Sequence, residues 1–269
     1  MPVDRRLVLA ALGSSLVVRH AIAQPADAVL MRLVAGSQRD STNTARDGAR
    51  HPVQSLGFWG LKPGMTVLEI WPNPGYWTEI LAPYAKATGG VYIAAMSSPN
   101  QALPPKFQDK AAYGPIRTTV FNKSSGPLAP DGSVDLVLTA RNIHDWMWTP
   151  GMAEKAMKDF FAALKPGGIL AVEDHRADPR PMVPEARDGY VATAFIIKLA
   201  KDAGFRLEAQ SEINANPKDT KDHPFGVWTL PPTRRSAPSG QPADPSFDHS
   251  KYDAIGESDR MTLRFRKPV

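Results

Sequence analysis

The segment from residue 61 to residue 82 constrains the fold most strongly, because it reads as a turn, a strand, a tight loop and a helix. Pro63-Gly64 indicates the turn, and the apolar run Met65 to Ile70 is typical of a strand covered on both faces of a parallel sheet. Pro72 to Gly75 predicts a tight loop, and helical spacing follows it at Trp77, Ile80, Leu81 and Tyr84. Strand ends and helix amino termini converge at such loops, so this segment predicts the ligand-binding corner of an open α/β sheet.

Further short apolar runs predict the other strands of the same sheet. They span residues 91–95, 116–121, 134–139, 169–173, 205–209 and 261–266. Amphipathic patterns between them predict helices, for example from Gly151 to Leu164. This alternation of strands and helices is typical of an α/β domain with a mostly parallel sheet and helices on both faces.

Composition limits the classes of function. The chain has 269 residues, of which 42% are hydrophobic and 22% charged, as in an ordinary globular protein. It has no cysteine, which excludes disulfides, zinc–thiolate sites, iron–sulfur clusters and thiol nucleophiles. Removing the three arginines and one aspartate of the first 23 residues lowers the net charge from +5 to +3. That charge is too small to indicate nucleic acid binding, and we expect a small-molecule substrate.

The first 23 residues have the three-part layout of a secretory signal peptide. Arg5-Arg6 precede the uncharged stretch Leu7 to Val18, which is too short for a membrane span of about 20 residues. Ala21-Ile22-Ala23 is typical of a cleavage site. We therefore expect cleavage after Ala23 and a periplasmic or secreted protein without an integral membrane segment. An uncleaved anchor or an ordinary N-terminal helix is the alternative.

Residues 24–60 are interpreted as a helical cap over the ligand-binding edge of the sheet. Arg50 and His51 could reach an anionic ligand from this cap. The alternative is a solvated helix face that ends at the turn at Pro52.

The α/β domain itself is predicted over residues 61–269, with a long excursion at about 212–258. The part from residue 231 to residue 258 is rich in Pro, Ser and Asp and predicts extended coil or disorder. Such an excursion is unusual in a compact domain unless it wraps the body or covers a site.

A family resemblance rests on two motifs. Val67-Leu68-Glu69-Ile70 with the following loop resembles the first motif of class I S-adenosylmethionine-dependent methyltransferases, in particular a predicted exported bacterial branch whose loop begins with Trp-Pro. Leu164 to Gly168, followed by an apolar strand, is similar to a second family signature. The resemblance implies a Rossmann-like fold with a seven-stranded sheet, an antiparallel last strand and S-adenosylmethionine as cofactor. The residues that it assigns to the cofactor are Glu69, Trp71, Gly75 and Asn122.

The sequence departs from the family at two places. The family has glycines at three alternate positions after the acid, where this chain has Trp71, Asn73 and Gly75. The family also has an acid near the end of the second strand, where this chain has Ala95 or Met96.

The loop from Ala140 to Trp148 carries the best candidates for chemistry, because it follows a buried strand and holds an amide, an imidazole and a carboxyl group. By resemblance, Asn142, His144 and Asp145 would face the transferred methyl group, with His144 or Asp145 as the base. In the alternative interpretation, His144 caps the next helix and the tryptophans belong to the core. The predicted substrate-binding residues are Trp146, Asp174, His175 and Tyr76.

Two other functions are compatible with the sequence. In the first, the fold is a binding module with an aromatic pocket lined by Trp71, Tyr76, Trp77 and Trp146. In the second, the protein is a metal-assisted hydrolase whose donors are His144, Asp145, Glu173, Asp174 and His175.

Overall fold

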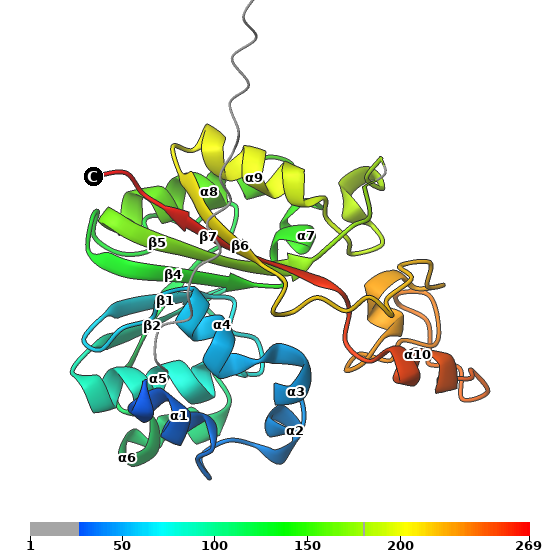
Figure 1. Cartoon of the computed structure of the whole chain (residues 1–269), viewed down its shortest axis with the longest axis horizontal. Helices are drawn as coiled ribbons and strands as arrows, with labels where there is room; N and C mark the ends of the chain where they lie inside the picture. Colours follow the sequence, from blue (N-terminus) through cyan, green and yellow to red (C-terminus); the bar gives the residue numbers. More distant parts are fainter. Residues whose placement is uncertain (1–26, 180) are drawn as a thin grey trace, which may run out of the picture.

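The strands form one seven-stranded sheet in the computed structural model, which describes residues 27–179 and 181–269. The order across the sheet is β3-β2-β1-β4-β5-β7-β6, and β7 is antiparallel to both of its neighbours while the other pairs are parallel (Figure 1). The strands are β1 (Thr66–Ile70), β2 (Val91–Met96), β3 (Ile116–Val120), β4 (Val134–Ala140), β5 (Leu164–His175), β6 (Arg206–Ser211) and β7 (Arg260–Arg266). The predicted fold class is confirmed, including the antiparallel last strand.

Helices cover both faces of the sheet (Figure 1). One face carries α1 (Ala28–Val34), α4 (Pro52–Phe58), α5 (Thr78–Thr88) and α6 (Lys110–Tyr113). The other face carries α7 (Ile143–Trp146), α8 (Met152–Ala163) and α9 (Thr193–Asp202). Shorter elements are α2 (Ser41–Thr44), α3 (Asp47–Arg50), α10 (Ser250–Ile255) and the 3-10 turns η1 (Pro105–Gln108), η2 (Pro184–Ala186) and η3 (Gly226–Thr229).

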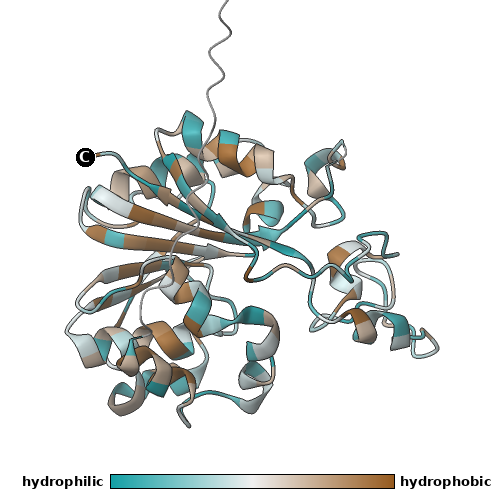
Figure 2. Cartoon of the chain, viewed as in Figure 1, coloured by the Kyte–Doolittle hydropathy of each residue, from teal (hydrophilic) through white to brown (hydrophobic). Residues whose placement is uncertain are grey.

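Two hydrophobic cores lie on opposite faces of the sheet, because successive strand residues point to opposite sides. On β1, Leu68 and Ile70 join the core beneath α8, whereas Val67 joins the core beneath α5. The apolar residues are concentrated in the strands and on the inner faces of the helices (Figure 2). Burial on both sides explains why the sequence shows continuous apolar runs in place of clean alternation.

The excursion between β6 and β7 contains η3 and α10 and is otherwise irregular. It lies beyond the carboxyl ends of the parallel strands, beside α2 and α3 (Figure 1). The Asn214 amide donates to Ser55 Oγ at 3.1 Å and Thr262 Oγ1 at 3.0 Å. Arg176 binds Asp259 with two hydrogen bonds of 3.0 and 2.8 Å. The excursion is therefore held against the domain at both of its ends.

The predicted signal peptide at residues 1–23 lies outside the described residues. Within residues 27–179 and 181–269, no helix combines the length and the hydrophobicity that crossing a lipid bilayer requires.

Candidate active site

The loop after β1 keeps an unusual backbone conformation at three alternate positions. Trp71, Asn73 and Gly75 have φ angles of 47°, 51° and 98°. Left-handed backbone is strained for residues other than glycine, so neighbouring structure must hold the first two in place. At Gly75 a Cβ atom would lie 2.4 Å from the Phe107 ring, which requires glycine there. The backbone is therefore left-handed at all three positions where the resemblance expects glycine, although the sequence retains one glycine.

The Trp71 side chain lies across the carboxyl ends of neighbouring strands. Its backbone N–H donates to the Ala95 carbonyl at the end of β2, and its indole N–H donates to the Phe121 carbonyl after β3 at 2.8 Å. Because β2 lies between β1 and β3, the indole has to cross the end of β2. Trp146 packs edge-to-face against it, with ring centroids 5.8 Å apart.

Glu69 points to the α5 face of the sheet and is fully buried. Its carboxyl group accepts hydrogen bonds from Tyr92 Oη at 2.5 Å and from Thr78 Oγ1 at 3.2 Å. Burial raises the pKa of Glu69 to about 7, although both hydrogen bonds act in the opposite direction. The side chain therefore joins β1, β2 and the start of α5, and its role toward a cofactor stays a prediction.

Two asparagines lie at the carboxyl ends of strands. Asn142 is buried and donates to the Ile70 carbonyl at 2.8 Å, which places it between β1 and β4, where the strand order reverses. Its Oδ1 atom has no hydrogen-bond partner among the described residues and can accept one from a ligand. Asn122 instead donates to the Ser97 carbonyl at 3.2 Å and accepts from the Ser124 N–H at 3.0 Å.

His144 is held on α7 by a carboxylate from β5. Its Nδ1 lies 2.8 Å from Asp174 Oδ1, and its Nε2 lies 3.4 Å from Asp145 Oδ1. Burial works against the charged imidazole, but the charges of Asp174 and Asp145 outweigh it and raise the pKa of His144 above its usual value. The ring of Trp228, from the excursion, lies 5.9 Å from that of His144. His144 is therefore an oriented, covered imidazole and not the cap of a helix.

His175 forms a pair with His144, and the two ring centroids are 4.9 Å apart. His175 Nδ1 lies 2.5 Å from Ser258 Oγ at the end of the excursion. Burial, followed by the positive charges of His144, Arg141 and Arg260, holds the pKa of His175 well below its usual value. Two imidazoles with pKa values pushed apart can supply one proton donor and one proton acceptor at the same pH.

The metal-site hypothesis is supported only by proximity. Single donor atoms of His144, Asp174 and His175 lie within 4.8 Å of one another. However, the Asp174 carboxylate already accepts from the backbone N–H groups of Ile143 and His175, at 2.8 Å each, and from the His144 ring. Glu173 turns toward Arg260, at 3.1 Å. Asp174 therefore positions α7 and His144, and these donors do not favour a metal centre.

The predicted aromatic pocket is wrong, because its four residues belong to different cores. Trp71 and Trp146 pack on the α8 face of the sheet, whereas Tyr76 and Trp77 pack on the α5 face. Trp146 is also completely buried, so it supports Trp71 and does not present a surface to a substrate. The sequence shows the aromatic residues but not the face of the sheet to which each one turns.

Several residues near the site escaped the sequence interpretation. Arg141 directly follows β4 with a φ of 59°, and its position at a strand end was the available signal. Trp228 and Ser258 come from the excursion, and Arg260 begins β7. Arg50 was assigned to a ligand or to a solvated face, and its burial rules out the solvated face.

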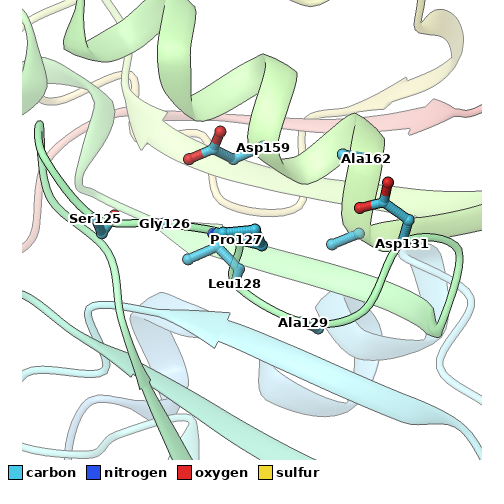
Figure 3. A pocket seen from close by; sticks show the side chains of 9 residues that line it. Ser125, Gly126, Pro127, Leu128, Ala129, Asp131, Asp159 and Ala162 are labelled. Atoms are coloured by element: carbon cyan, nitrogen blue, oxygen red, sulfur yellow. The ribbon is translucent and has the colours of Figure 1, made fainter.

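A pocket of about 290 Å³ lies apart from these residues, between the loop after β3 and α8 (Figure 3). Ser125, Asp131 and Asp159 contribute its polar groups, and Asp159 is already paired with Lys155. No candidate active-site residue lines this pocket, so it is not part of the site.

Comparisons with known proteins agree with the architecture. No protein-family model matches the chain. The ubiquinone/menaquinone biosynthesis C-methyltransferase UbiE of Hydrogenovibrio crunogenus is 27% identical over 145 residues. The alignment covers 52% of this chain and 53% of UbiE, so this chain spans about half the length of the curated relative that it matches.

Solved structures are similar over most of the chain. An S-adenosylmethionine-dependent methyltransferase from Aquifex aeolicus matches with a TM-score of 0.53 and 16% identity, over 83% of this chain and 93% of that one. The cyclase SpnF matches with a TM-score of 0.53 and 14% identity, over 89% and 92%. An arsenic(III) S-adenosylmethionine methyltransferase from Chlamydomonas reinhardtii matches with a TM-score of 0.50 and 15% identity, over 91% and 75%. The chain therefore has the Rossmann-like fold of class I S-adenosylmethionine-dependent methyltransferases.

Proposed function

We propose that the protein is an S-adenosylmethionine-dependent methyltransferase acting on a small molecule. The observation that carries this proposal is the loop after β1, whose backbone is left-handed at residues 71, 73 and 75 at the ligand-binding corner of the fold. Strained backbone of this kind is retained where surrounding structure and function require it. The similarity to UbiE, a C-methyltransferase, and the shared fold support the same activity.

The backbone of the loop after β1 fits this cofactor, but the Trp71 side chain has to move before the cofactor can bind. In the family, the ribose of the cofactor lies over the end of the second strand, which is where the Trp71 indole lies here. Binding therefore requires the indole to turn away. The end of β2 offers Ala95 and Met96, both buried, in place of an acid, so the ribose hydroxyls would find their partners elsewhere.

The chain's own residues supply the groups around the methyl acceptor. The free Oδ1 atom of Asn142 accepts a hydrogen bond from the acceptor, while the cofactor supplies the methyl group. Asp174 fixes the His144 ring, whose raised pKa favours the protonated form. Asp145 is partly exposed beside His144 Nε2 and is the better-placed proton acceptor of the two predicted bases.

Titration calorimetry with S-adenosylmethionine and S-adenosylhomocysteine tests the cofactor assignment. We expect micromolar binding to residues 24–269, with a change in tryptophan fluorescence as Trp71 turns. Replacing Trp71 with glycine should tighten binding, because the variant removes the side chain that covers β2. If neither the wild type nor Trp71→Gly binds either compound at millimolar concentration, the cofactor assignment is rejected.

We also infer that the protein is exported, on the basis of Arg5-Arg6, the uncharged stretch Leu7 to Val18 and the small residues that end at Ala23. Asp4 to Leu9 weakly resembles a twin-arginine signal, a route that would allow the chain to fold and bind its ligand first. Cell fractionation with N-terminal sequencing tests this. A cytoplasmic protein that retains Met1 would contradict export.

A further inference from the structure

Four arginines from distant parts of the chain gather around two glutamates, and two of them, Arg141 and Arg260, lie near the histidine pair. Arg46 and Arg50 come from the N-terminal cap, Arg141 follows β4, and Arg260 begins β7. Arg141 lies close enough to Arg46, Arg260 and the two histidines for their charges to act on one another. The two carboxylates among them are Glu173 and Glu257. We call these six residues the arginine cluster.

Glu257 accepts most of the hydrogen bonds within the arginine cluster. Its carboxylate accepts from Arg46 Nε at 2.6 Å, from Arg50 Nε at 3.1 and 3.2 Å, and from Arg260 Nη1 at 2.6 Å. Arg260 Nη1 also lies 3.1 Å from Glu173. One carboxylate thus serves three guanidinium groups, and the fourth, Arg141, has no hydrogen-bond partner among the described residues.

Each of the four guanidinium groups retains a buried N–H without an acceptor. The unpaired donors are Arg46 Nη2, Arg50 Nη2, Arg141 Nε and Arg260 Nε. Arg50 and Arg260 are each 1% exposed, so bulk water does not satisfy them. Leaving buried charged donors unpaired is costly to the folded protein. Glu173 Oε1 also lacks a hydrogen-bond partner in the described part of the chain, so the cluster has four free donors against one free acceptor of its own and can receive further acceptors.

The arginine cluster also has a surplus of positive charge. Four guanidinium groups face two carboxylates, a surplus of two positive charges. Burial also raises the pKa of Glu173, which weakens its negative charge further. The neighbouring carboxylate, Asp47, is occupied by two hydrogen bonds from Arg39 and one from Tyr76. An anion with several oxygen atoms would satisfy both the charge and the free donors.

The position of the cluster connects it to the proposed methyl transfer. It lies beyond the ends of β4 and β5. The nucleoside part of the cofactor belongs at the ends of β2 and β3, on the other side of β1. Arg50 stacks over Tyr76 of the loop after β1, 4.3 Å from the ring centroid. The Arg46 and Asp47 side chains are 15% and 25% exposed, so this edge of the cluster reaches the protein surface.

We propose that the arginine cluster binds the anionic group, a carboxylate or a phosphate, of the methyl acceptor. The assignment of the anion to a methyl acceptor rests on the proposed function, whereas anion binding by the cluster does not. The anion lies next to His144 and His175, so the rest of the acceptor is presented to the proton-transferring groups. The cluster then determines which substrates enter, because a neutral molecule would leave the guanidinium groups unpaired.

Calorimetric titration with inorganic phosphate tests the cluster in the full mature chain. Arg141→Gln is the informative variant, because Arg141 has no hydrogen-bond partner whose loss would disturb the fold. Arg117→Gln, on the exposed side of β3, is the matched control. We expect phosphate to bind the wild type, affinity to fall at least about tenfold in Arg141→Gln, and the control to remain within about twofold. Equal affinity in all three proteins would overturn the proposal.

Repeating the phosphate titration with saturating S-adenosylhomocysteine tests whether the anionic group belongs to the acceptor or to the cofactor. Unchanged phosphate affinity supports the acceptor assignment, whereas competition would show that the arginines hold the cofactor's own carboxylate and would overturn it. Binding of S-adenosylhomocysteine without phosphate binding rejects the cluster and leaves the proposed function standing. Phosphate binding, with no S-adenosylhomocysteine binding to either the wild type or Trp71→Gly, rejects the proposed function and leaves the anion site standing.

Discussion

Glu69 carries a buried carboxyl group whose ionisation should weaken the fold as the pH rises. In the folded protein burial raises its pKa to about 7, against 4.5 for an ordinary glutamate. The folded state therefore retains a proton that the unfolded chain has already lost. Stability from this group is complete below about pH 4.5 and is lost as the pH rises through the folded pKa near 7. Glu69→Gln removes the ionisation while keeping an acceptor for Tyr92 and Thr78.

The size of the effect follows from the shift. One pKa unit corresponds to about 1.4 kcal/mol, so the difference between the two pKa values gives about 3 kcal/mol between pH 4.5 and pH 8. Since many groups titrate in this range, the quantity to compare is the change in unfolding free energy of the wild type minus that of Glu69→Gln.

Urea unfolding at pH 5 and pH 8 measures this difference. We expect the wild type to lose about 2.5 kcal/mol more than Glu69→Gln between the two pH values. Glu154→Gln, an exposed substitution on α8, is the control and should behave like the wild type. If Glu69→Gln and the wild type lose the same free energy, the carboxyl group is not buried as described and the reasoning fails.

Three further predictions concern the site and its support. Asp174→Asn should lower the pKa of His144, because the carboxylate charge raises it; NMR titration of the imidazole checks this, and an unchanged pKa would contradict the pairing. Trp71→Phe should cost about 1 kcal/mol of unfolding free energy, since it removes the donor to the Phe121 carbonyl, and denaturant unfolding would expose a zero effect. Trp146→Ala should cost about 3–5 kcal/mol because the ring is wholly buried, and a loss below 1 kcal/mol by the same assay would refute its core position.

The fold could be predicted well because its signals are local. The apolar run ending at Ile70 and the turn at Gly64 marked β1, and similar runs marked the other strands within a residue or two, except that β5 begins at Leu164, five residues before its predicted start. The alternation of these runs with amphipathic helices indicated the α/β class. The antiparallel last strand followed from the resemblance, since a strand pattern alone does not show how a strand pairs with its neighbours.

The sequence indicated candidate site residues only at strand ends. Asn142, His144 and Asp145 were candidates because they follow β4, and the structure places His144 beside Asp174 and His175. The aromatic pocket failed because the loop after β1 turns between Trp71 and Tyr76, so their rings pack on opposite faces of the sheet. The coil prediction for residues 231–258 recognised irregular backbone but not the contacts that hold it.

By itself, the sequence determined the secondary structure, the class of fold, the loop at the ligand-binding corner and the absence of thiol chemistry. Only the tertiary structure decided that Trp71 crosses the end of β2 and that Glu69 faces inward. It also decided that Arg46, Arg141 and Arg260 meet around Glu257. These residues are more than 200 positions apart at the extremes, and contacts over that separation depend on how the sheet, the cap and the excursion pack together. Periodicity describes what each segment can bury, whereas the partner that each buried group finds is a property of the whole fold.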